Sequence, residues 1–244
     1  MTTPNPIKHT PNIITLANLL AGCLSIVSAF EGNLLLAGYL ILLAAIFDYF
    51  DGFTARLLKA YSPLGKELDS LADLVSFGVA PSVLLFHLLR DSLNIPATEG
   101  LTAGHTLLVI PFTVAIFSAL RLAKFNIDTR QTVSFIGLPT PANAMFIVGL
   151  ILGLDSPFAK WFQIVTSSPT AIIALSLVLS ALLVAPIPMF SLKVKSLNIK
   201  QMWRQHLLIA LSLLSIFILG RASLTPIILL YILISIVGLI FKEE

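Results

Sequence analysis

The sequence predicts an all-α polytopic membrane protein with about eight transmembrane helices, and two observations support this prediction. Of the 244 residues, 57% are hydrophobic and only 11% are charged, whereas a soluble domain has about 25% charged residues. The apolar residues are also gathered into long runs, and a spanning helix needs about 20 mostly apolar residues. The net charge of +3 is explained better by basic cytoplasmic loops than by a nucleic-acid partner.

The apolar runs follow one another with short polar links. The first begins after a polar, proline-rich stretch and is longer than the roughly 7–15-residue core of a signal peptide, so we expect it to remain as a span. Glycine and proline inside the runs are tolerated in bundled membrane helices. No internal repeat and no soluble domain is visible, so residues 1–244 are predicted to form a single membrane domain. The predicted spans are residues 12–30, 33–55, 70–90, 104–123, 138–154, 169–187, 205–220 and 224–241.

The basic residues predict the orientation, because lysine and arginine are enriched in cytoplasmic loops. With the N-terminus in the cytoplasm, 12 of the 15 basic residues fall on the cytoplasmic side. The other three, Arg90, Lys160 and Arg221, fall on the opposite side. We therefore expect a protein of the cell (inner) membrane whose two termini are cytoplasmic.

Four carboxylates lie where the second and third spans meet the cytoplasm: Asp48, Asp51, Asp69 and Asp73. The first two are three residues apart and the last two are four apart, so each pair lies on one face of its helix. A short turn makes the two helices antiparallel neighbours, and all four carboxylates converge near the inner boundary. Ionisable groups at membrane depth cost roughly 2.5–3.5 kcal/mol each on insertion scales, so this cluster predicts a functional site.

The residues around the carboxylates indicate the chemistry. Carboxylate oxygens without histidine or cysteine suit Mg²⁺ or Mn²⁺, and two such ions can clamp both oxygens of a displacement at phosphorus. Gly52 and Ala55 leave room for a ligand, and Arg56 adds a guanidinium suited to phosphate oxygens. Ordinary salt bridges at the membrane boundary would explain one pair of acids but not four in this register. The pattern predicts a metal–diphosphate site that faces the cytosol.

The spacing D-x2-D-G-x2-A-R-x8-G-x3-D-x3-D resembles the signature of the CDP-alcohol phosphatidyltransferase family. The fixed positions are Asp48, Asp51, Gly52, Ala55, Arg56, Gly65, Asp69 and Asp73. The resemblance implies transfer of a phosphatidyl group from a CDP-linked lipid to an alcohol, with two divalent cations and release of CMP. It also implies a homodimer and a six-helix catalytic core, here residues 1–187, to which residues 205–241 would add two helices.

The resemblance further implies a role for each position of the motif. The four aspartates would hold the two metal ions, and Asp73 would also be the catalytic base that takes the proton of the alcohol. The residues that would contact the nucleotide and its diphosphate are Asp51, Gly52, Ala55, Arg56 and Gly65. Asn18, on the first helix, would face the nucleotide as well, although helix–helix hydrogen bonding explains this residue equally well.

Three further stretches resemble the integral-membrane phosphatidylserine synthase branch of this family. They are P-N-I-I-T-L-A-N at 11–18, R-L-A-K-F-N at 121–126 with F-I-G-L-P-T-P-A-N at 135–143, and A-P-I-P-M-F-S-L-K at 185–193. This resemblance implies in-line attack of L-serine on CDP-diacylglycerol, giving phosphatidylserine and CMP. Arg121 and Lys124 are candidates for binding the serine carboxylate, but anchoring at the cytoplasmic boundary is the better physical explanation of the two residues.

Two alternatives remain open from the sequence. In the first alternative, the protein is another member of the family whose acceptor is glycerol 3-phosphate or an inositol-type alcohol. A phosphorylated acceptor would require a cluster of cationic side chains near the metal ions. In a different class, the acidic cluster is the ion site of a divalent-metal transporter. Such sites usually lie near the membrane midplane between broken helices, often in inverted repeats.

Overall fold

Helices make up nearly all of the computed structural model, which describes residues 9–96, 102–127, 135–190 and 202–240. The predicted all-α class is confirmed. The α-helices are α1 (Thr10–Phe30), α2 (Leu34–Leu57), α3 (Pro63–Asp73), α4 (Ala80–Ser92), α5 (Thr113–Ile127), α6 (Thr140–Leu154), α7 (Ala159–Thr166), α8 (Pro169–Val184), α9 (Trp203–Leu219) and α10 (Leu224–Ile240). A π-helical turn, η2 (Leu74–Val79), joins α3 to α4, and two 3-10 segments are η3 (Ala103–Phe112) and η4 (Gly220–Ser223).

Among the described residues, five helical runs are long and apolar enough to cross a membrane, so the chain is an integral membrane protein. They are Thr10–Phe30, Leu34–Leu57, Pro63–Ser92, Thr106–Ile127 and Trp203–Gly238. The helices α7 and α8 meet at 84° and make a sixth if the pair is one span. Two features explain why at most six spans are counted where eight were predicted. The helix α6 has only 15 residues, and α9 and α10 are counted together as one continuous apolar run.

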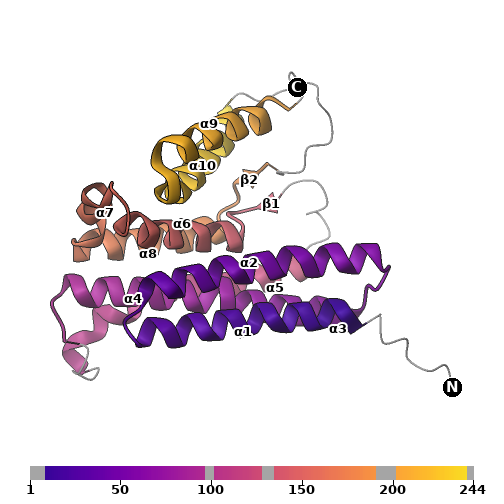
Figure 1. The fold of residues 1–244 in the computed structure, drawn as a ribbon, viewed down its shortest axis with the longest axis horizontal. Helices are drawn as coiled ribbons and strands as arrows, with labels where there is room; N and C mark the ends of the chain where they lie inside the picture. Colours follow the sequence, from indigo (N-terminus) through magenta and orange to yellow (C-terminus); the bar gives the residue numbers. More distant parts are fainter. Residues whose placement is uncertain (1–8, 97–101, 128–134, 191–201, 241–244) are drawn as a thin grey trace.

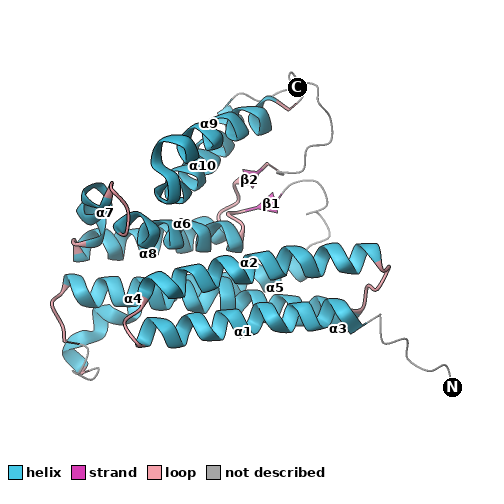
Figure 2. Ribbon diagram, viewed as in Figure 1, coloured by secondary structure: helices cyan, strands magenta, loops and turns pink. Residues whose placement is uncertain are grey.

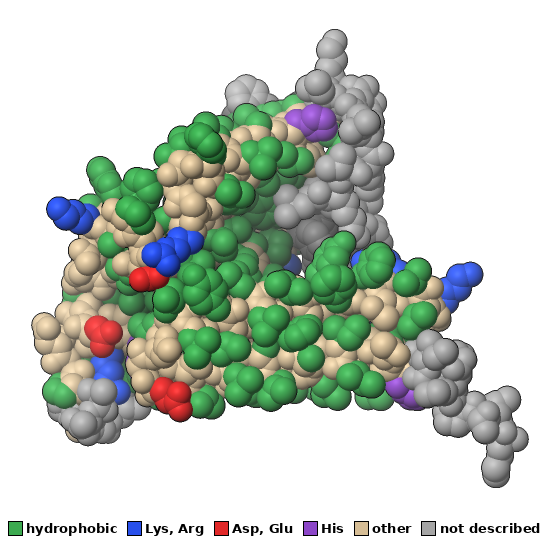
Figure 3. Space-filling model, viewed as in Figure 1, with side chains coloured by type: hydrophobic (Ala, Val, Ile, Leu, Met, Phe, Trp, Pro, Cys, Tyr) green, Lys and Arg blue, Asp and Glu red, His purple; other side chains and the backbone are tan. Residues whose placement is uncertain are grey.

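The first helix shows how the bundle meets its surroundings. Its large apolar side chains are exposed on one stripe, Ile13, Leu16, Leu20, Leu24 and Val27. The opposite face, which is buried, carries small or polar residues, Thr15, Asn18, Gly22, Ser25 and Ala29. Membrane helices pack through small residues because lipid solvates the large apolar ones as well as a protein core does. On the face of the molecule shown in Figure 3, hydrophobic side chains cover the middle, and the charged ones lie toward the two ends.

The helices lie in layers (Figure 1). One layer contains α1 to α5, a second contains α6 to α8, and the hairpin of α9 and α10 lies beyond the second layer. The helices α4 and α6 are buried along most of their length. Phe77, Leu84 and Ile147 are among the largest completely buried side chains and mark the centre of the core between these layers.

Helix α1 connects the two helices that carry the acidic residues, because it packs against both α2 and α3. The Ser25 hydroxyl donates to the Ala37 carbonyl at 2.8 Å. Gly22 packs so closely on η2 that a β-carbon there would lie 2.4 Å from the Ser76 hydroxyl oxygen. The acidic ends of α2 and α3 are thus held by a shared helix, and their side chains face each other beside it.

Two contacts fix the start of α3 to the end of α5. The Lys66 ammonium donates to the Asn126 carbonyl at 2.9 Å, and the Asn126 amide donates to the Ser70 hydroxyl at 2.8 Å. Two of the three stretches used for the branch assignment also come together near this end of the bundle (Figure 2). There β1 (Phe135–Ile136) pairs antiparallel with β2 (Pro188–Met189), a short ladder that the sequence did not predict. Residues 191–193 of the third stretch lie outside the described residues.

The C-terminal hairpin contacts the rest of the bundle through α10. The Thr225 hydroxyl donates to the Phe146 carbonyl at 3.0 Å, where Gly149 leaves no room for a β-carbon. The Tyr231 hydroxyl donates to the Phe190 carbonyl at 3.2 Å, directly after β2. The helix α9, in contrast, buries only Leu208. The hairpin is therefore attached along one of its two helices.

Candidate active site

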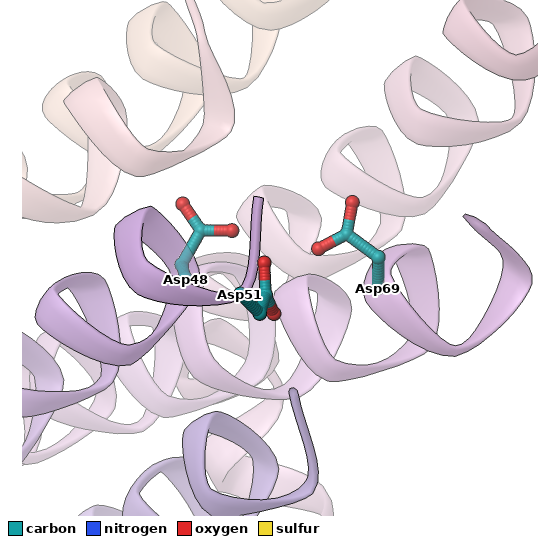
Figure 4. A group of neighbouring side chains, drawn as sticks. All are labelled: Asp48, Asp51 and Asp69. Carbon is teal, nitrogen blue, oxygen red and sulfur yellow. The ribbon is translucent and has the colours of Figure 1, made fainter. Parts of the chain in front are cut away.

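Three of the four predicted acidic residues meet between α2 and α3. Asp48 and Asp51 come from α2 and Asp69 from α3, and their carboxylates point toward the same space (Figure 4). One oxygen of each carboxylate lies within 4.8 Å of the others. The spacing predicted that each pair shares a helix face, and the structure brings the two helix faces together.

The acidic group has the properties of a cation site. One oxygen of Asp51 and one oxygen of Asp69 are buried and have no hydrogen-bond partner among the described residues. Burying an unpaired carboxylate destabilises the folded protein unless a cation compensates its charge. Oxygen donors of this kind fit a hard divalent cation such as Mg²⁺ or Mn²⁺. The donor set therefore fits a divalent metal.

The alternative of ordinary salt bridges is not supported within the described part of the chain. Lys66, the basic residue nearest Asp69 in sequence, donates to the Asn126 carbonyl instead. Arg56 is exposed, and a terminal nitrogen of its guanidinium lies 3.6 Å from the position that a β-carbon on Gly52 would take. The surface beside Gly52 is otherwise open, so Arg56 and Gly52 border the acidic group without neutralising it.

Asp73 lies beside the three-carboxylate group and differs from it. It is only 9% exposed, the most enclosed of the four acids apart from Asp51. The Asn18 amide donates to one of its oxygens at 3.4 Å, and the Ser76 hydroxyl donates to the Asn18 carbonyl at 3.0 Å. Asn18, which was expected to face the nucleotide, therefore contacts an acidic residue of the motif directly.

A cavity of about 230 Å³ adjoins the acidic group. It is lined from α1 by Asn12 and Thr15, from α2 by Asp51 and Ala55, and from α3 by Gly65 and Asp69, among others. A β-carbon on Gly65 would lie 3.0 Å from the Ser62 hydroxyl oxygen and 3.1 Å from the Asn12 side-chain oxygen. Ser62 is the N-cap of α3 and accepts from the Gly65 backbone amide. A glycine is therefore suited to this narrow floor of the cavity.

The two candidate acceptor residues on α5 differ in their surroundings. Arg121 is 7% exposed, and its guanidinium donates to the Thr140 hydroxyl at 3.0 Å. It also lies within range of the charge of Asp73. Lys124 is exposed. The structure thus places Arg121, but not Lys124, in the interior near the acidic residues.

One buried polar residue was missed by the sequence reasoning. Asn143, in the first turn of α6, is 0% exposed, and neither its amide nitrogen nor its side-chain oxygen has a hydrogen-bond partner among the described residues. An asparagine inside an otherwise apolar helix was the available signal, because polar residues at membrane depth are functional candidates.

Known proteins resemble the chain along nearly its whole length. A family model described as CDP-alcohol phosphatidyltransferase matches residues 8–237. The CDP-diacylglycerol–serine O-phosphatidyltransferase of Helicobacter pylori strain J99 is 31% identical over 239 residues, which are 97% of this chain and 93% of the relative. The Bacillus subtilis protein of the same name is 40% identical over 141 residues, 58% of this chain and 74% of the relative. An archaetidylserine synthase of Methanothermobacter thermautotrophicus is 35% identical over 161 residues, 65% of this chain and 64% of the relative.

Proposed function

The chain belongs to the CDP-alcohol phosphatidyltransferase family, and we propose that it transfers the phosphatidyl group of CDP-diacylglycerol to the hydroxyl of L-serine, giving phosphatidylserine and CMP. The facing carboxylates of Asp48, Asp51 and Asp69 are the structural observation that supports this activity most directly. They provide a cation site next to a cavity, as transfer at a diphosphate requires. The serine acceptor follows from the relatives that carry this activity in their names.

Two divalent cations, Mg²⁺ or Mn²⁺, are the proposed cofactors. Asp48, Asp51, Asp69 and Asp73 would hold them. When bound, such ions stabilise negative charge on the diphosphate and on the leaving CMP. The unpartnered oxygens of Asp51 and Asp69 support this assignment.

The donor nucleotide and diphosphate are proposed to occupy the cavity between α1, α2 and α3. Asp51, Ala55 and Gly65 line it, and Gly52 leaves the adjoining surface open. The guanidinium of Arg56, at this open surface, would contact phosphate oxygens. Asn18 would act through its hydrogen bond to Asp73 at the inner end of the site.

In the proposed reaction the serine hydroxyl attacks the phosphorus that carries the diacylglycerol, and its proton passes to Asp73. The new bond joins the serine oxygen to that phosphorus. The bond from the same phosphorus to the oxygen shared with the CMP phosphate breaks, and CMP leaves with the electron pair. Arg121 would bind the serine carboxylate, in line with its burial and its proximity to Asp73. Lys124 is exposed and would serve at most in attracting the acceptor.

The arrangement in the membrane is also a proposal. In this arrangement the chain crosses the cell membrane eight times, and both termini and the acidic site lie on its cytoplasmic side. Residues 1–187 would form the catalytic core, and residues 205–241 would add two helices. The start of α1 and the turn between α2 and α3 lie toward the same side of the molecule (Figure 1), which supports this orientation. CDP-diacylglycerol would enter from the lipid, and serine from the cytosol. A homodimer is proposed from the family alone.

The test is CMP release by purified protein in mixed micelles with CDP-diacylglycerol and Mn²⁺. Serine, glycerol 3-phosphate and inositol are compared as acceptors, and the lipid product is identified by mass spectrometry. Release that depends on serine, with phosphatidylserine as product, is the expected result. Release with glycerol 3-phosphate or inositol alone would retain the family chemistry and overturn the acceptor. No release with any acceptor from folded protein would favour a metal-binding role without transfer, such as a divalent-metal transporter.

A further inference from the structure

The side chain of Asn143 is a buried amide that forms no hydrogen bond with the described residues. It is completely enclosed, and neither amide atom has a hydrogen-bond partner among the described residues. Buried polar groups are almost always paired, because an unpaired amide in the interior destabilises the fold. A buried side chain whose polar atoms find no partner among the described residues is expected to pair with a ligand that the chain itself does not supply.

Two other buried polar residues, Thr140 and Arg121, lie close to Asn143. Thr140 lies three residues earlier on the same face of α6, is also 0% exposed, and accepts a hydrogen bond from one terminal nitrogen of Arg121. The Nε atom of Arg121 is buried without a partner among the described residues. A planar guanidinium with an unused donor is suited to a carboxylate. We call Arg121, Thr140 and Asn143 the α5–α6 polar cluster.

The α5–α6 polar cluster lies at the depth of the acidic residues. The helices α2 and α6 pack against each other and run in opposite directions (Figure 1). Gly38 of α2 faces Val148 and Ile151 of α6. Moving toward the site along both helices therefore brings the Thr140–Asn143 turn opposite the last turn before Asp48. The helix α5 packs against η2, which begins directly after Asp73, so Arg121 approaches the same site from α5.

We propose that Asn143 is a specificity-determining residue that binds the charged groups of an α-amino-acid acceptor. Its side-chain oxygen accepts a hydrogen bond from the acceptor ammonium, and its amide nitrogen donates to the acceptor carboxylate, which Arg121 binds at Nε. This inference rests on the proposed function and adds to it the recognition of the ammonium group. The cluster contains a single cation, which matches one carboxylate rather than the double charge of a phosphate. Donor binding involves α1 to α3 and does not use Asn143.

Steady-state kinetics with separately varied serine and CDP-diacylglycerol test the inference on the full chain in mixed micelles. The variants are Asn143→Ala, Asn143→Asp and a control, Ser176→Ala, which changes a buried serine on α8 whose hydroxyl bonds to its own helix. For Asn143→Ala, KM for serine should rise about tenfold or more, the effect of losing hydrogen bonds to charged groups. KM for CDP-diacylglycerol should change less than twofold. The control should match the wild type in both.

The second variant separates the two charged groups of the acceptor. Asn143→Asp keeps an oxygen for the ammonium but repels the carboxylate. KM for serine should therefore rise, while ethanolamine, which has no carboxylate, should inhibit this variant at least as strongly as it inhibits the wild type. Weaker inhibition by ethanolamine would overturn the assignment of the ammonium to the side-chain oxygen of Asn143.

A purely structural role is distinguished by thermal unfolding without substrates. Because the amide is unpaired, Asn143→Ala should not lower Tm. A lower Tm with unchanged KM for serine would overturn the inference and leave the proposed function standing. An unchanged KM in either variant, with serine-dependent CMP release by the wild type, would do the same. If the wild type releases CMP without needing serine, the proposed function fails, and the inference fails with it.

Discussion

The proposed donor side and the proposed acceptor side of the site are built in different ways. The donor side is contiguous in sequence: its acidic residues and its cavity come from α1, α2 and α3. The acceptor side joins α5 and α6, and its polar groups are almost completely enclosed. If both proposals hold, the metal and nucleotide site corresponds to a local sequence motif, whereas the choice of acceptor depends on tertiary packing.

The strongest test of this division is Asp73→Asn, at the junction of the two sides. Loss of the proposed base should lower kcat by about 10²- to 10⁴-fold. The cavity and the other three carboxylates remain, so CMP with Mn²⁺ should still raise Tm. The measurement is CMP release together with the ligand-induced Tm shift. Near-normal kcat would remove Asp73 from the role of base, and loss of the Tm shift would show that metal and nucleotide binding need its carboxylate.

Arg121→Lys should affect the acceptor side alone. Lysine keeps the charge but lacks the planar donors of the guanidinium, including the Nε group. KM for serine should rise about ten- to a hundredfold, the equivalent of roughly 1.5–3 kcal/mol, with KM for CDP-diacylglycerol unchanged. Kinetics with one substrate varied at a time will show this. An equal effect on both substrates would mean that the two sides are not separate.

Gly65→Ala should give the reverse pattern. The added methyl group would lie 3.0–3.1 Å from Ser62 and Asn12 at the floor of the cavity. An overpacking cost of about 1 kcal/mol would raise KM for CDP-diacylglycerol about fivefold and leave KM for serine unchanged. Binding of CMP, followed by thermal shift, should weaken in parallel. An effect on serine alone would contradict the placement of the donor in this cavity.

Tyr231→Phe is expected to have the smallest effect, and it concerns the attachment of α10. The change removes one hydrogen bond, from the tyrosine hydroxyl to the Phe190 carbonyl. Stability should fall by about 1 kcal/mol, observed as a lower Tm, with little change in KM for either substrate. A large rise in KM for serine alone would show that α10 forms a wall of the acceptor side.

The same contrast separates what the sequence predicted from what it did not. The long apolar runs predicted both ends of α1 and α2 to within about two residues, and the motif spacing predicted that Asp48, Asp51 and Asp69 come together. The helical run of the third predicted span begins seven residues earlier than expected, at Pro63. The missed features depend on packing: α7 is only eight residues long, and the β1–β2 ladder joins segments about fifty residues apart. Asn143 can be read from the sequence as a polar residue at the start of an apolar helix. That its side chain is buried without a hydrogen-bond partner is known only from the residues packed around it.

The number of spans depends on how the turns between apolar helices are counted. Hydropathy detects apolar composition, but the break between two spans depends on the turn. The helices α9 and α10 are separated only by the short η4 segment, where Gly220 has a positive φ of 55°. Arg221 and Ser223 lie in this turn, and the predicted break between residues 220 and 224 coincides with it. The break between α7 and α8, in contrast, is a sharp bend of 84° across residues 167–168.

The contacts among Lys66, Asn126 and Ser70 have a thermodynamic consequence. They fasten the start of α3, the helix of Asp69, to the end of α5, the helix of Arg121. If α3 shifts when the donor binds, we expect these contacts to pass the shift to α5 and so to link the binding of the two substrates. Linkage is reciprocal, so any factor by which CDP-diacylglycerol tightens serine binding is the factor by which serine tightens CDP-diacylglycerol binding.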